Sequence, residues 1–244
     1  MQHSNATSPP PGWTLSLYPD AGEAGGTFQR PRTAGKPKGR DPERAKIEAD
    51  RRARSKVRRY CAANRLNRLG TLTYRGVGCH DPLTFRRDVG VFFRGLRTAL
   101  GDEAFPYVWT PEWHKSGHGL HAHFAVGRYI ARRKIEQAWG HGFVHIKLLG
   151  DLPVGTTALD EARVAARYLS KYIGKDFGTA RSEGLHRYDV AQGFQPRVER
   201  FRGRSSHVVL AAATGAMGRP PAEVFTSAEV DGYVGAPWVW ASWR

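Results

Sequence analysis

Two histidines lie two positions apart in the otherwise apolar segment HGLHAHFAVG, residues 118–127. Because successive side chains of a β-strand point to opposite faces, we expect His121 and His123 on one face and the apolar side chains on the other. The same alternation places Glu112, in the preceding segment FPYVWTPEW, on the face of the histidines. Two imidazoles and one carboxylate can bind a divalent cation and leave positions open for a substrate oxygen. We therefore predict a metal site formed by His121, His123 and Glu112.

The third ligand of this site depends on the strand register. Pro111 directly precedes Glu112, and a proline within a strand can disturb its pairing. Two more histidines, His114 and His118, lie in the glycine-containing turn HKSGHG between the two strands. Either of them replaces Glu112 as the third ligand if the register differs.

A second group of reactive side chains lies in the segment RYLSKYIGKD. In a helix, two tyrosines and two lysines of this segment fall on one face: Tyr168, Lys171, Tyr172 and Lys175. A phenol with a pKa of about 10 is only about one part in a thousand ionised at neutral pH, so it is a poor nucleophile alone. A nearby ammonium group stabilises the phenolate, while a metal ion polarises a phosphoryl oxygen. The histidine pair and this helix face together favour attack of a tyrosine on a phosphate group.

Alternating strand and helix patterns surround these groups. Period-two patterns predict three strands besides the histidine strand, over residues 69–76, 105–113 and 142–149, and helical patterns occupy residues 81–100, 131–139 and 159–175. The order β-α-β-β-α-β followed by α is that of the split βαβ, ferredoxin-like arrangement. We therefore predict an α+β fold with an antiparallel sheet, helices on one face, and the tyrosine-bearing helix beside the metal site.

The rest of the chain is expected to form two flanking regions. Residues 1–42 are basic and rich in Pro and Gly, with no periodicity, which predicts a disordered tail. Residues 43–178 then form the domain that carries the site, beginning with a basic helix. Residues 179–244 form a C-terminal extension of unknown role. For its tryptophans in APWVWASWR, packing, base stacking and anchoring of a partner remain open.

The formal net charge of the chain is +16, from 38 Lys and Arg against 22 Asp and Glu. Such an excess indicates a polyanionic partner, and nucleic acid is the leading candidate. Between Arg30 and Arg68 there are 15 Lys or Arg against four Asp or Glu. A solvated helix face is the alternative to phosphate binding there. The side chains that we expect to bind DNA are Arg51, Arg52, Arg54, Lys56, Arg58, Arg59 and Lys147.

Membrane insertion is not expected, because no apolar run approaches the roughly 18 to 20 residues of a spanning helix and no signal peptide opens the chain. The two cysteines, Cys61 and Cys79, have neither CxxC spacing nor a disulfide framework. Reduced cysteines suit a cytoplasmic protein, which is the location that we predict.

These motifs resemble those of the HUH endonucleases, and within them the replication initiators of rolling-circle plasmids and single-stranded DNA phages and viruses. LGTLTY is similar to the first motif of the family, and HAH at residues 121–123 to the His-hydrophobic-His motif for which it is named. YLSKYIGKD resembles the third motif, a tyrosine followed three residues later by a lysine. That pattern occurs twice, as Tyr168 with Lys171 and as Tyr172 with Lys175. The resemblance covers roughly residues 66–178.

The resemblance implies a site-specific nickase. A tyrosine would attack a phosphodiester in single-stranded or hairpin origin DNA, giving a 5′-phosphotyrosine and a free 3′-hydroxyl for host polymerase. Mg²⁺ or Mn²⁺ held by His121, His123 and Glu112 would orient the phosphate, and Tyr172 would act first with Tyr168 as its partner. The 244 residues contain no GxxxxGK[ST] phosphate loop, so unwinding would need a host helicase.

Several other functions use part of the same pattern. A relaxase or a Y1-type transposase would apply the same chemistry to another DNA substrate. A non-catalytic DNA-binding protein accounts for the charge but leaves the histidine pair and the tyrosines unexplained. A non-haem iron oxygenase shares two histidines and a carboxylate but predicts neither the charge nor the tyrosines.

Overall fold

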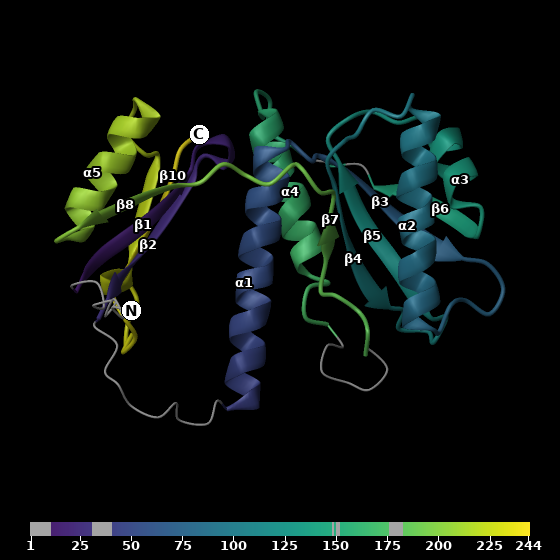
Figure 1. The fold of residues 1–244 in the computed structure, drawn as a ribbon, viewed down its shortest axis with the longest axis horizontal. Helices are drawn as coiled ribbons and strands as arrows, with labels where there is room; N and C mark the ends of the chain where they lie inside the picture. Colours follow the sequence, from purple (N-terminus) through teal and green to yellow (C-terminus); the bar gives the residue numbers. More distant parts are fainter. Residues whose placement is uncertain (1–10, 31–40, 148, 150–151, 176–182) are drawn as a thin grey trace, which may run out of the picture. The chain divides into compact units, whose positions relative to one another are not determined.

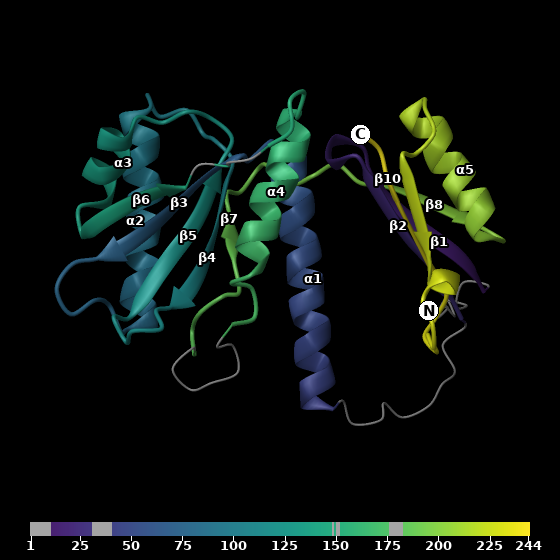
Figure 2. The same cartoon turned by 180° about the vertical axis from the view of Figure 1, so that it is seen from behind.

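The computed structural model describes residues 11–30, 41–147, 149, 152–175 and 183–244. The chain divides into two compact units, one formed by Met1–Arg40 with Arg197–Arg244 and the other by Asp41–Pro196. Figures 1 and 2 show the elements of each unit from opposite sides. None of the helices in these described ranges has the length and apolar composition needed to cross a bilayer.

The unit of residues 41–196 is built on a five-stranded antiparallel sheet in the order β6-β3-β5-β4-β7. Its strands are β3 (Arg68–Tyr74), β4 (Tyr107–Trp113), β5 (Leu120–Val126), β6 (Gly142–Lys147) and β7 (Asp189–Val190). Its helices are α1 (Pro42–Ala63), α2 (Pro82–Ala99), α3 (Arg132–Trp139) and α4 (Ala158–Ser170). The predicted element order is therefore confirmed, and with it the α+β fold class.

Alternation along the strands gives this sheet two different faces. One face carries Leu72, Trp109 and Phe124, which pack with Phe92 of α2 and Trp139 of α3 in one buried core. The other face is covered only near one end of the strands. There, α1 and α4 form a second core with three strand residues, namely Leu69, Val108 and Ala125. Helices thus lie on both faces, and the remaining end of the second face carries the histidines.

The unit formed by the two ends of the chain has its own five-stranded antiparallel sheet, in the order β8-β1-β2-β10-β9. Its elements are β1 (Gly12–Tyr18), η1 (Pro19–Ala21), β2 (Glu23–Gln29), β8 (Glu199–Gly203), α5 (Ser206–Met217), β9 (Glu223–Thr226), η3 (Ser227–Glu229) and β10 (Trp238–Ser242). Val209 of α5 packs against Leu15 and Leu17 of β1 in a small buried core. This unit was not predicted from the sequence.

The prediction that residues 1–42 form a disordered tail is wrong for residues 12–29, which form the β1-β2 hairpin. The segment WTLSLY alternates apolar and polar residues, and its two leucines are fully buried. Gly22, at φ 59°, takes the left-handed conformation at the turn. The two partners that flank this hairpin, β8 and β10, lie about 170 residues or more further along the chain, so a local pattern could not reveal them. The remainder of the predicted tail, residues 1–10 and 31–40, lies outside the described residues.

Candidate active site

The two histidines lie on the central strand β5, between β3 and β4. His121 is the cross-strand partner of Glu112 on β4, and His123 is the partner of Thr110 on β4 and of Thr71 on β3. Directly opposed side chains on one face of a sheet are close neighbours. Pro111 therefore leaves the register intact, and Glu112 shares the face of the histidines as expected. Both histidines are buried, with relative exposures of 7% and 6%.

Two threonines of β3 hold the imidazole rings. The hydroxyl of Thr71 lies 3.0 Å from Nδ1 of His123, and the hydroxyl of Thr73 lies 3.3 Å from Nδ1 of His121. Hydrogen bonds of this kind orient histidines that bind metal ions. The sequence analysis did not assign this role, although the alternation in LGTLTY places both threonines on one face.

The two Nε2 atoms differ in their surroundings. Nε2 of His123 lies 2.7 Å from Oε2 of Glu112. Nε2 of His121 is buried and has no hydrogen-bond partner among the described residues. A buried polar atom without a partner is uncommon in proteins and fits a place where an external group binds.

Charge around Glu112 and His121 suits a metal ligand set. Burial raises the pKa of the Glu112 carboxyl, but the hydrogen bonds and charges of His123 and Lys175 outweigh burial and bring this pKa to about 2. Burial, with smaller contributions from His114 and His123, lowers the pKa of His121 to about 4. At neutral pH the carboxylate is therefore ionised and His121 is neutral, which are the forms that bind metal ions.

The donor set fits a divalent cation, but the described residues show no group of three His, Cys, Asp or Glu side chains arranged for one. Glu112 explains part of this difference, because its carboxylate bonds to His123 and, at 2.7 Å, to Nζ of Lys175. The two histidines of the connecting turn take other partners. His114 stacks on His121, with ring centroids 4.5 Å apart, and Nε2 of His118 lies 2.8 Å from the Gly76 carbonyl oxygen.

The tyrosine-bearing segment is only partly helical. The sequence predicted a helix to residue 175, but α4 ends at Ser170 and residues 171–175 form turns. The amides of Lys171 and Tyr172 donate to carbonyl groups three residues back, at 3.2 Å and 3.0 Å. The chain then turns at Gly174, whose φ is +87°. An L side chain rarely adopts this conformation, which explains why the helix is not continued. Residues 176–178 of the predicted domain lie outside the described residues.

This turn brings Tyr172 onto the histidine strand. The rings of Tyr172 and His123 are stacked, with centroids 3.6 Å apart and an interplanar angle of 12°. Tyr168 lies further away, with its ring centroid 6.2 Å from His123 and 5.4 Å from Tyr172. The structure thus places both tyrosines next to the histidine pair, and Tyr172 is the nearer.

Three ammonium groups lie over the two phenol rings. Nζ of Lys175 is 5.1 Å from the centroid of the Tyr172 ring. Nζ of Lys147 and Nζ of Lys171 are 5.1 Å and 5.5 Å from the centroid of the Tyr168 ring. Such cations are attracted to the faces of aromatic rings. Lys147, predicted to bind DNA, therefore lies beside the tyrosines.

The basic helix α1 contacts the tyrosine turn through a residue that was predicted to bind DNA. The guanidinium of Arg54 donates to the carbonyl oxygen of Ile173 at 3.1 Å. One turn earlier on α1, Asp50 pairs with Arg187, and its carboxylate lies against Gly174. We had not expected α1 to position this turn. The remaining predicted DNA-binding side chains of α1 are exposed (Arg51, Arg52, Lys56) or half-buried (Arg58, Arg59).

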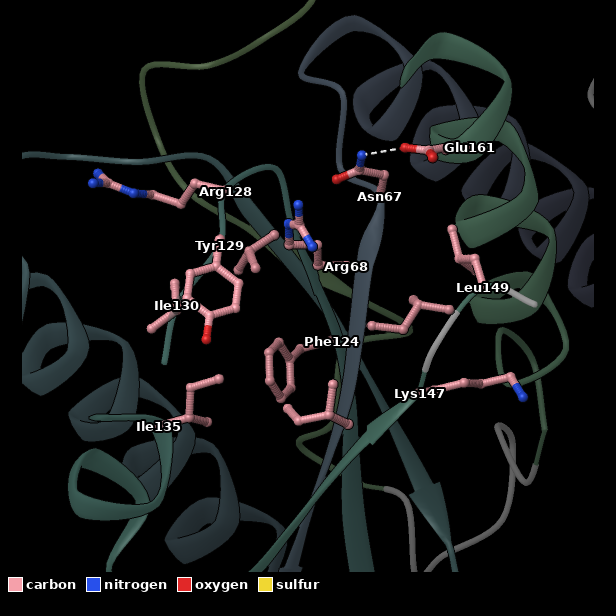
Figure 3. A pocket seen from close by; sticks show the side chains of 13 residues that line it. Asn67, Arg68, Phe124, Arg128, Tyr129, Ile130, Ile135, Lys147, Leu149 and Glu161 are labelled. Carbon is pink, nitrogen blue, oxygen red and sulfur yellow. Dashed lines mark hydrogen bonds between the residues drawn. The ribbon is translucent and has the colours of Figure 1, made fainter. Parts of the chain in front are cut away.

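A cavity of about 380 Å³ opens where β6 leaves β3, and Lys147 lines it (Figure 3). Its apolar walls include Phe124 and Tyr129, and its polar rim includes Arg68. The Asn67 side chain, also in this wall, donates to the carboxylate of Glu161 on α4. Lys147 therefore belongs both to the surroundings of Tyr168 and to this cavity.

Residues 67–177 match a family model described as replication-associated protein, of the ORF2 type. The match points to replication. It covers every candidate metal-binding and nucleophilic residue described above, together with Lys147, but it begins after the arginines of α1. No curated protein and no solved structure matches the chain. Resemblance to replication-associated proteins therefore rests on less than half of the chain, and that part contains the whole site.

Proposed function

We propose that this protein is a rolling-circle replication initiator of the HUH endonuclease type, acting in the cytoplasm on single-stranded or hairpin origin DNA. The observation that carries the proposal is the stacking of Tyr172 on His123, because it brings a nucleophile against a candidate metal ligand. The two residues are 49 positions apart in the sequence. The match to replication-associated proteins over the same residues supports this function.

The proposed reaction is a transesterification. The phenol oxygen of Tyr172 attacks the phosphorus of a DNA phosphodiester and forms a new O–P bond. The bond from phosphorus to the 3′ oxygen breaks, and that oxygen takes up a proton to become a 3′-hydroxyl. Because the 5′-phosphotyrosine retains the bond energy, the strand can later be rejoined. The free 3′-hydroxyl then serves host polymerase, and a host helicase opens the duplex.

The side chains around Tyr172 determine how its proton is held. Burial, a hydrogen bond with Tyr168 and the charge of Glu112 raise the pKa of the Tyr172 phenol above its usual value. The phenol therefore meets the DNA in its protonated form, and attack requires stabilisation of the developing phenolate. Lys175, which lies over the Tyr172 ring and pairs with Glu112, supplies positive charge at this place. A Mg²⁺ or Mn²⁺ ion held by His121, His123 and Glu112 would polarise a phosphoryl oxygen.

We expect the purified protein with Mn²⁺ to become covalently attached to single-stranded DNA. The probe is a pool of labelled oligonucleotides with a randomised centre, and the readout is a gel shift that survives detergent. Sequencing the attached strands then gives the nick site. A shift that detergent abolishes and that weakens steeply with salt would instead indicate non-catalytic binding. A relaxase or a Y1-type transposase would give the same adduct, and its attached sequence would map to a transfer origin or a transposon end.

The turn at Gly174 gives a further prediction. Gly174→Ala places a methyl group against the Asp50 carboxylate and in a left-handed conformation, which costs about 1–2 kcal/mol. We expect the free energy of unfolding to fall by about this amount and the adduct to form at least tenfold more slowly, because Tyr172 is displaced from His123. Thermal unfolding and a time course of adduct formation measure the two effects.

Gly101→Ala is the matched control for this turn. Gly101 has a φ of +88°, close to that of Gly174, but a methyl group there meets no other atom within 4 Å. This variant should lose a similar amount of stability and keep the normal rate of adduct formation. Equal rates for both variants would show that the turn does not position the nucleophile.

A further inference from the structure

The sheet formed by the two chain ends has one face without a helix of its own. Leu15, Leu17 and Val239 point to the face that α5 covers. In the described part of this unit α5 is the one α-helix, so the opposite face carries side chains that need another explanation. The pairing register sorts these side chains into two rows across the sheet.

The first row crosses all five strands. It consists, in spatial order, of Arg200, Ser16, Gly25, Trp240 and Phe225. The second row, two residues along each strand and about 7 Å away, consists of Arg202, Thr14, Thr27 and Trp238. Each row therefore has an arginine at one side, small residues in the middle and aromatic rings at the other side.

The aromatic side of the face is a platform rather than part of the core. Trp243, which is fully buried, and Val239 lie in the core under α5, whereas Trp240 alternates to the other face and is half-buried. The rings of Trp240 and Phe225 lie side by side, with centroids 5.8 Å apart and an angle of 32°, and Phe225 is 47% exposed. Tyr233 packs edge-on against Trp238, with centroids 6.3 Å apart.

The arginine side of the face is available to an anion. Arg200 and Arg202 are exposed on β8, and neither side chain forms an ion pair or hydrogen bond within the described residues. Arg197 and Arg244 of the same unit, by contrast, pair with carboxylates. Three strand spacings, roughly 14 Å, separate β8 from β10, and only Ser, Thr and Gly side chains lie between them.

We propose that this face binds single-stranded DNA, with phosphates at Arg200 and Arg202 and bases stacked on Trp240, Trp238 and Phe225. Unpaired bases stack on exposed rings beside cationic side chains, and a duplex does not offer its base faces in this way. The whole chain carries a net charge of +16, which suits a polyanion over an acidic or apolar partner surface. The site is separate from the proposed nicking chemistry and does not depend on it.

Two variants of the full-length protein test the face. Arg200→Glu with Arg202→Glu should weaken binding of a labelled 30-mer of thymidine, measured by fluorescence anisotropy, by at least about tenfold. The slope of log K against log salt should become shallower by about 1.4, since each phosphate contact with a single strand contributes about 0.7. Trp240→Ala should weaken binding by roughly 5- to 100-fold, and Trp240→Phe should restore most of the loss because it keeps a stacking ring.

Arg219→Glu is the matched control, since Arg219 is also exposed in this unit but follows α5 on the covered side of the sheet. An equal loss of affinity in this control would overturn the proposal, because it would reduce the effect to net charge. Duplex DNA bound as tightly as the single strand, with the same sensitivity to Trp240→Ala, would also overturn it. Thermal unfolding of each variant shows whether the unit is still folded.

Crosslinking locates the strand directly. Thymidine oligomers carrying 5-iodouracil should crosslink to the peptide that contains Trp238 and Trp240, and crosslinks confined to residues 41–196 would overturn the proposal. The two proposals fail separately in these experiments. Crosslinks at Trp240 without a detergent-resistant adduct would refute the nicking function alone, and an adduct without these crosslinks would refute this binding face alone.

Discussion

Tyr172→Phe is expected to abolish the covalent protein–DNA adduct. The substitution removes only the phenol oxygen and keeps the ring that stacks on His123, so the surroundings of the site should persist. Loss of a nucleophile usually costs several orders of magnitude in rate, and we expect a decrease of at least about a thousandfold. A single-turnover time course with Mn²⁺ and the selected oligonucleotide, analysed on a denaturing gel, measures this decrease.

Tyr168→Phe tests the order of the two tyrosines. Tyr168 lies further from His123, so we expect this variant to form the first adduct at nearly the normal rate and to fail in later strand transfer. Tyr129→Phe is the control, because Tyr129 is exposed and lies in the wall of the cavity next to Lys147. Loss of the first adduct in Tyr168→Phe with retention in Tyr172→Phe would reverse the assignment.

His121→Ala and His123→Ala should each remove metal binding and cleavage together. Nε2 of His121 has no partner among the described residues, and Nε2 of His123 faces Glu112, so each substitution removes one of the three proposed ligands. We expect the affinity for Mn²⁺, measured by calorimetry or electron paramagnetic resonance, to fall at least a hundredfold. The adduct should then be absent at Mn²⁺ concentrations that saturate the unmodified protein.

The controls for the metal site keep the imidazole ligands. His145→Ala removes an exposed histidine from the same face of the sheet, where it lies opposite Thr71, and should bind Mn²⁺ normally. Thr71→Val keeps both ligands but removes the hydroxyl at Nδ1 of His123, and should weaken Mn²⁺ binding about 10- to 100-fold. Unchanged Mn²⁺ affinity in His121→Ala, in a protein that still unfolds cooperatively, would refute the metal assignment.

Local patterns in the sequence were sufficient for the larger unit. Alternation in LHAHFAV and in YVWTPEW predicted β5 and β4 and put Glu112 on the histidine face, because the period of a strand fixes which side chains share a face. The pattern of α4 was also recognised, but its end was not. The glycine at position 174 stops the helix through a backbone conformation and a close contact with Asp50, which comes from a distant helix.

Contacts between distant segments escaped prediction. The bond from Arg54 to the Ile173 carbonyl and the pair of Lys175 with Glu112 join residues far apart in the chain, with no spacing signal. The second sheet escaped for the same reason, since β2 pairs with β10 more than 200 residues later. Its glycine-rich hairpin reads as a loop when it is considered without that partner.

The pairing of β2 with β10 also bears on the order of events during synthesis. The hairpin leaves the ribosome first but cannot complete its sheet until the last strand has been translated, whereas residues 41–196 contain all of their own strands. Domains generally fold as units during translation, so the unit with the tyrosines should reach its native state while the hairpin still lacks partners. A nascent chain arrested before β10 would then hold a finished catalytic half beside an unpaired, protease-sensitive N-terminal segment.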